Sequence, residues 1–118
     1  MKTLATFVHL TVSLLFTVGW GGLVVVSVAT KGWYDDLIAP VVIALISAVY
    51  VVIGFVNRKG SNAGASALGI MLTVPLVGAV AEPFDFEMPG LIIGGVPAFL
   101  LGLCCVVHAM EARRETGV

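Results

Sequence analysis

The chain has 118 residues, of which 59% are hydrophobic and 11% are charged, with a mean hydropathy of +1.11 and a formal net charge of -1. A soluble domain of this size leaves much of its surface in water, so this composition excludes a protein that folds in water. The charge also excludes nucleic acid as a partner, because six Lys and Arg residues are too few to follow a phosphate backbone.

Four uncharged intervals divide the chain, at residues 3–30, 37–57, 60–81 and 88–110. A hydrocarbon core of about 30 Å needs about 20 helical residues, and a helix satisfies its own backbone hydrogen bonds without water. The sequence therefore predicts an all-α integral membrane four-helix bundle that forms one domain over residues 1–118. Its helices are predicted at about 4–30, 37–57, 63–81 and 89–110.

The first helix, 4–30, has a signal peptide as its alternative, because Ser27-Val28-Ala29 resembles a cleavage site after an apolar run. We expect a retained helix, since a signal's apolar region spans only about 7 to 15 residues. Near the middle of this helix, the cluster Gly19-Trp20-Gly21-Gly22 either admits a neighbouring helix or unwinds around a ligand.

The four helices are expected to form two hairpins with the same plan. In each hairpin a loop with aromatic and acidic residues, 31–36 or 82–87, precedes a helix that begins near a proline, Pro40 or Pro89. Membrane topology alone explains most of this likeness, and an internal duplication is the alternative.

Within the second half of the chain, the turn before the third helix offers Ser61 or Asn62 as its N-cap. Pro75 and Pro97 fall inside the third and fourth helices, where the missing N–H groups predict kinks.

Basic residues set the orientation, because loops rich in Lys and Arg stay in the cytoplasm. With four crossings, only Lys31 lies on the side opposite the other five, which are Lys2, Arg58, Lys59, Arg113 and Arg114. Both termini are therefore expected to be cytoplasmic, in a multi-pass protein of the cell membrane, either inner or plasma membrane.

Small residues at a spacing of four predict where the helices touch, because apolar burial drives little association in lipid. The rows comprise Ser13, Thr17 and Gly21 on the first helix, Ser61, Ala65, Gly69 and Thr73 on the third, and Gly90, Gly94, Ala98 and Gly102 on the fourth. We expect these rows to pack within the bundle, and a dimerisation face on the fourth helix is the alternative.

The spans contain no Asp, Glu, Lys or Arg, which weighs against ion-coupled transport. The chain resembles four-helix multidrug exporters in length and hydropathy, but it lacks the glutamate that those proteins carry in their first helix. It also lacks nucleophile-elbow, phosphate-loop and zinc-protease motifs, so we expect no enzymatic activity.

His9 and His108 are predicted at similar depth on the first and fourth helices. Such a pair can ligate the iron of haem b or contact a quinone. The interpretation that we favour is a pair of interfacial histidines that contact headgroups or backbone carbonyls, with no cofactor and no metal.

Cys104 and Cys105 are adjacent, a feature that resembles mercury-transport membrane proteins in this pair alone. Neighbouring helical side chains point about 100° apart, so we expect the two cysteines to serve packing. Lipidation and soft-metal transfer are the alternatives.

These features favour a non-catalytic accessory or structural subunit of a larger membrane complex. Its partners would be the lipid bilayer and other membrane subunits or copies of itself. The first alternative is a homo-oligomeric pore-former, because the chain is similar to holins in size, number of spans and charged tail, Glu111–Glu115. The second is a transporter or channel for a neutral solute that enters near Gly19–Gly22.

Overall fold

The computed structural model describes residues 2–60, 62–82, 88 and 91–116, and the regular structure of these residues is entirely helical. The long helices are α1 (Lys2–Lys31), α2 (Ile38–Lys59), α3 (Ala63–Ala81) and α5 (Val96–Thr116), with a 3-10 turn η1 (Asp35–Leu37) and a π-helical segment η3 (Leu91–Gly95). The prediction of an all-helical bundle is confirmed for this part of the chain. Four of its helical segments are long and apolar enough to cross a membrane.

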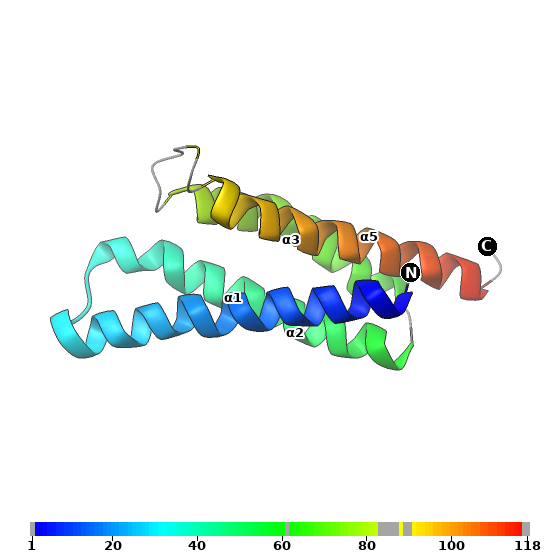
Figure 1. Cartoon of the computed structure of the whole chain (residues 1–118), viewed down its shortest axis with the longest axis horizontal. Coiled ribbons are helices and arrows are strands. Elements are labelled where there is room, and N and C mark those ends of the chain that lie inside the picture. Colours follow the sequence, from blue (N-terminus) through cyan, green and yellow to red (C-terminus); the bar gives the residue numbers. More distant parts are fainter. Residues whose placement is uncertain (1, 61, 83–87, 89–90, 117–118) are drawn as a thin grey trace.

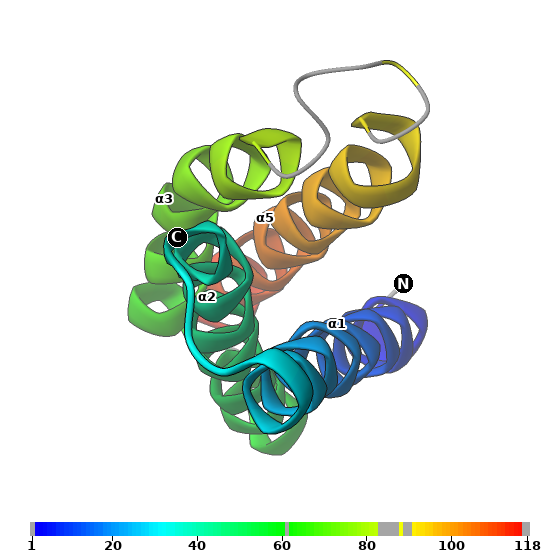
Figure 2. The ribbon, with the colours of Figure 1, turned by 90° about the vertical axis from the view of Figure 1, so that its left-hand side faces the viewer.

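The helices form two antiparallel hairpins, α1 with α2 and α3 with α5 (Figure 1). The start of α1, the end of α2, the start of α3 and the end of α5 lie at one end of the molecule, which we call the terminal end. The end of α1, the start of α2, the end of α3 and η3 lie at the opposite end, the loop end. Figure 2 shows that the ribbons of α1 and α5 diverge toward the loop end.

Local signals explain where the helices begin and end. Gly32 ends α1 with a φ of +78°, a conformation that glycine adopts easily because it has no Cβ. Its N–H donates to the carbonyl of Val28 at 3.0 Å. Asn62 is the N-cap of α3, because its Oδ1 accepts a hydrogen bond from the N–H of Ala65 at 3.0 Å. Ser61, the other predicted cap, is outside the described residues.

The fourth helix differs from its predicted range of 89–110. The π-helical η3 directly precedes α5. Pro97, the second residue of α5, has no N–H, so it cannot donate the α-helical hydrogen bond to the carbonyl of Ile93. At the other end, α5 continues through the charged tail, where Arg114 pairs with Glu111 at 3.3 Å. Charged residues mark where a helix leaves lipid, which need not be where the helix ends. Residues 83–87, Pro89 and Gly90 lie outside the described residues.

The core is built mainly from α2, α3 and α5. Its buried members are Ile43, Tyr50, Ile53, Leu76, Val80, Ala98, Leu101 and Cys105. The apolar stretch of α1 is only 6% buried, against 39% for α2 and for the span of α5. The first helix is therefore the one that the bundle covers least.

Candidate functional site

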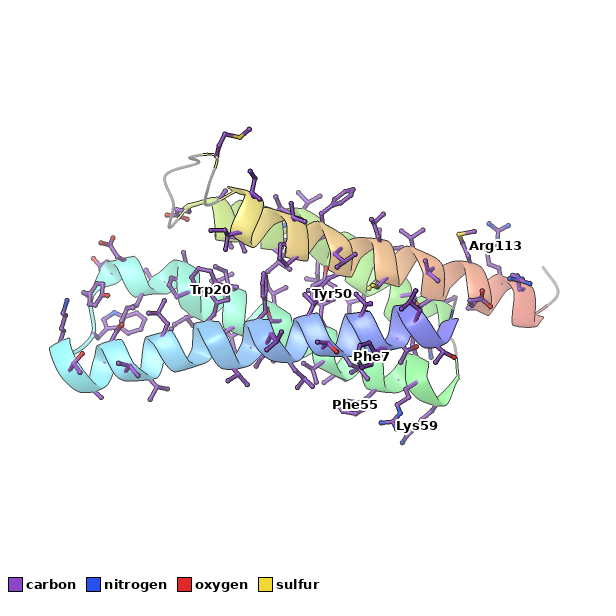
Figure 3. All side chains as sticks on the ribbon, viewed as in Figure 1. Phe7, Trp20, Tyr50, Phe55, Lys59 and Arg113 are labelled. Atoms are coloured by element: carbon purple, nitrogen blue, oxygen red, sulfur yellow. The ribbon has the colours of Figure 1, made fainter. Side chains whose placement is uncertain are left out.

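Polar side chains from all four long helices meet inside the bundle, in what we call the buried polar layer. Its members are His9 and Ser13 on α1, Tyr50 on α2, Thr73 on α3, and Cys105 and His108 on α5. All of them except the half-buried Thr73 are completely or almost completely buried. Figure 3 shows Tyr50 between the two hairpins, at the level of this layer.

His9 links α1 to both α2 and α5. Its Nε2 lies 2.7 Å from the backbone carbonyl of Tyr50, and a carbonyl only accepts, so Nε2 carries the proton. In the neutral imidazole, Nδ1 then accepts, and it faces the Sγ of Cys105 at 4.0 Å, a distance suited to a weak S–H donor. The two ring nitrogens of His9 thus connect three helices.

Tyr50 links α2 to α3. Its hydroxyl donates to the backbone carbonyl of Gly69 at 2.6 Å and lies 3.0 Å from the Oγ1 of Thr73. The Thr73 hydroxyl is also 3.0 Å from the carbonyl of Gly69. Satisfied polar contacts of this kind hold membrane helices in register where apolar burial does not.

Three glycines make these contacts possible, because a side chain at each position would meet a neighbouring helix. A Cβ on Gly54 would lie 2.8 Å from the His9 ring and 2.7 Å from Leu10, and a Cβ on Gly102 would lie 2.6 Å from the Thr73 hydroxyl. A Cβ on Gly69 would overlap the Sγ of Cys105. The small-residue rows of the third and fourth predicted helices therefore face one another.

The other residues of the predicted rows lie in different surroundings. Gly94 and Ala98 are buried, and Ala65 and Thr17 are half-buried. Ser13 is buried, and its hydroxyl donates to the carbonyl of His9 at 2.7 Å. Gly21 has no atom within 4 Å of the position a Cβ would take. In the row on the first helix, Ser13 therefore packs inside the bundle, whereas Gly21 has no neighbouring helix against it.

The two histidines, which the sequence places at similar depth, lie together and are completely buried. The ring centroids of His9 and His108 are 5.4 Å apart and their planes are tilted by 51°, a normal geometry for rings in contact. A haem between them would require α1 and α5 to separate, because the macrocycle needs a slot that these rings and Cys105 occupy. Within residues 2–60, 62–82, 88 and 91–116, no group of three or more His, Cys, Asp and Glu is arranged to hold a metal ion.

The two cysteines point in different directions. Cys105 faces His9 inside the bundle, whereas Cys104 lines a shallow apolar groove between α1 and α5, next to Ala5 and Leu100. Both are free thiols. The two adjacent cysteines therefore lie in different surroundings, one inside the bundle and one at an apolar groove.

A second set of buried contacts, which sequence reasoning missed, joins α2 to α3 at the terminal end. Asn57 donates to the carbonyl of Ile53 at 2.9 Å, and its Oδ1 accepts from the N–H of Asn62 at 2.9 Å and the hydroxyl of Ser66 at 3.3 Å. The signal was present in the spacing of the small and polar residues of 37–57, namely Ser47, Tyr50, Gly54 and Asn57, which share one face.

A hollow of about 500 Å³ lies at the loop end beside Tyr34, Asp35, Asp36 and Glu82. The residues Gly19, Gly21 and Gly22 do not line it. Leu37 and Pro40, whose side chains are buried, also line the hollow, together with Leu23 of α1.

No protein-family profile, curated protein or solved structure matches this chain. Function therefore has to be inferred from the geometry. Hydrogen bonds of His9, Tyr50, Thr73 and Cys105 connect helices in the described polar layer, and the ring of His108 lies against the ring of His9.

Proposed function

We propose that this chain is a non-catalytic multi-pass membrane protein with cytoplasmic termini, which acts as an accessory subunit of a larger membrane assembly. The observation that carries the proposal is the contrast between the polar layer, whose hydrogen bonds join helices inside the bundle, and the outer half of α1 toward the loop end, which the bundle covers only in part. Recognition would then take place through helix packing within the membrane.

The distribution of charge supports the membrane orientation. Among the described residues, the terminal end carries the cations of the α2–α3 turn and of α5, whereas the loop end carries Asp35, Asp36 and Glu82 with Lys31. Cationic ends of membrane proteins stay in the cytoplasm. We therefore expect a tag placed after Val118 to be reachable in intact cells only after the membrane is permeabilised.

Exposed glycines on α1 support an intramembrane partner. Gly19 and Gly22 are exposed, and no atom lies within 4 Å of the position that a Cβ would take on either. Glycine lowers helix stability and gives lipid no side chain to pack against, whereas it lets a second helix approach closely. Gly78 on α3 is equally open, which makes it a matched control.

The test is purification of the tagged chain from its native membrane in a mild detergent. We expect the wild type and Gly78→Leu to retain larger membrane subunits in fixed ratio, and Gly22→Leu to lose them while it keeps its helical content. Blue native electrophoresis and mass spectrometry of the band measure both results.

Three outcomes would contradict the proposal. A wild-type chain that purifies as a lone monomer would do so, as would equal losses in Gly22→Leu and Gly78→Leu. A homo-oligomer that depolarises the membrane on expression would instead support a pore-former.

A further inference from the structure

A groove of about 470 Å³ runs between the first half of α1 and the last turn of α2, at the terminal end. Arg58 supplies its one charged side chain, and α1 supplies three threonines and three apolar side chains. Figure 3 shows Phe7 of this groove near the same end as Lys59. The groove is thus polar and cationic at the level where a membrane surface would lie.

The polar groups of the groove have no partners within the described part of the chain. Arg58 forms no ion pair or hydrogen bond there, and neither do the hydroxyls of Thr6 and Thr11. Further along the same helix, by contrast, Thr17 and Thr30 donate to the carbonyls one turn before them at 2.8 Å. The groove therefore offers a guanidinium and free hydroxyls to an external acceptor.

The apolar side of the groove continues inward from these donors. Phe7, Leu10 and Leu14 follow one face of α1 at helical spacing, and each successive residue lies further from the terminal end. Leu10 is held against Gly54 of α2, so the floor of the groove belongs to the fixed part of the bundle. A ligand that fits this order has an anionic head and a long apolar tail.

We propose that the groove binds an anionic phospholipid, with its phosphate at Arg58 and its acyl chain along Phe7, Leu10 and Leu14. A guanidinium presents paired donors that match phosphate oxygens, and the threonine hydroxyls supply further donors. The proposal rests on the membrane insertion in the proposed function, but it does not require a partner subunit. It can therefore fail while the accessory role stands, and the reverse also holds.

The experiment is native mass spectrometry of the full chain in detergent micelles, titrated with phosphatidylglycerol or phosphatidylcholine of the same acyl composition. We expect a 1:1 phosphatidylglycerol adduct that Arg58→Gln weakens about tenfold, the loss typical of one charge-assisted contact. Lys59→Gln, the matched control with the same change of charge outside the groove, should change the affinity less than about twofold. Circular dichroism checks that both variants keep their helical content.

The absence of an adduct would overturn the proposal, and so would equal weakening by Arg58→Gln and Lys59→Gln, which would indicate diffuse attraction to the basic end. Equal binding of phosphatidylcholine would mean that the anionic head is not recognised. Displacement of the lipid by millimolar glycerol phosphate would mean that the site takes a free phosphate compound and does not use its apolar wall. Persistence of the phosphatidylglycerol adduct under that challenge supports a lipid site.

Discussion

The two halves of α1 are both mainly apolar but lie in different surroundings. Toward the terminal end, His9 and Ser13 are fully buried and Leu10 is pressed against Gly54. Toward the loop end, Gly19 and Gly22 are exposed, with open space around each. The first half is therefore part of the bundle, and much of the second half is surface.

This difference shows what holds a small bundle of this kind together. Lipid tails are as apolar as leucine, so the apolar side chains of either half have little reason to prefer the protein interior. The terminal half differs because it has polar atoms to satisfy and lies against Gly54 of α2, which lets the two backbones approach. Fixed contacts follow those two features, and the remaining apolar surface faces outward.

The largest effect is expected at the contact between α3 and α5. Gly102→Leu places a side chain where the Thr73 hydroxyl lies, and overpacking of this kind should lower the free energy of unfolding by about 3 kcal/mol. Gly22→Leu makes the same change in open space and should leave the free energy of unfolding nearly unchanged. Titration with sodium dodecyl sulfate, followed by circular dichroism, measures both. Equal destabilisation would remove the distinction between the inner and outer surfaces.

Much of this arrangement could be predicted from the sequence, because charge and length act over whole segments. The four intervals without charge predict the helices, and the terminal and loop ends follow from the alternating direction of four long helices. The rows of small residues at a spacing of four, which include Gly69 and Gly102, predict the faces of α3 and α5 that meet. Each of these features repeats along a helix, so a one-dimensional pattern can record it.

The centre of the buried polar layer could not be predicted in the same way. The spacing of Ser47, Tyr50, Gly54 and Asn57 marks one face of α2, but which neighbour each residue meets depends on the rotation of α2 in the bundle. The pairing of His9 with the Tyr50 carbonyl uses a backbone atom, which every residue has and no sequence pattern distinguishes. Contacts that join one side chain to one backbone atom require the three-dimensional arrangement.

A medium effect is expected at His9, whose two nitrogens connect α1 to α2 and α5. His9→Ala removes the donor to the Tyr50 carbonyl and leaves a cavity, which should lower the free energy of unfolding by about 2 kcal/mol. His9→Gln keeps an amide donor of similar reach and should recover about half of that loss. The same detergent titration measures these changes. If the two variants are equally stable, the hydrogen bond to Tyr50 contributes nothing and only the volume of the ring matters.

The smallest effect is expected when a single methyl group is added to a glycine inside the bundle, Gly54, or to a glycine on its outer surface, Gly22. Gly54→Ala places a Cβ 2.7 Å from the Leu10 side chain and 2.8 Å from the His9 ring, so these side chains have to shift and the contact between α1 and α2 is disturbed. We expect a loss of about 1 kcal/mol in the free energy of unfolding. Gly22→Ala meets no atom and replaces glycine with the best helix former, so it should raise the free energy of unfolding by about 0.5 kcal/mol.

The opposite signs make this pair of variants a sharper test than either alone. The methyl group and the gain in helix propensity are the same, so the difference between the two measured values reports only what surrounds each glycine. If Gly22→Ala raises the free energy of unfolding, the fold itself does not require glycine at this position. The remaining physical reason for a glycine there is the close approach of another helix. A loss at Gly22 equal to that at Gly54 would instead assign the outer half of α1 to the bundle itself, and the proposed partner surface would have to lie elsewhere.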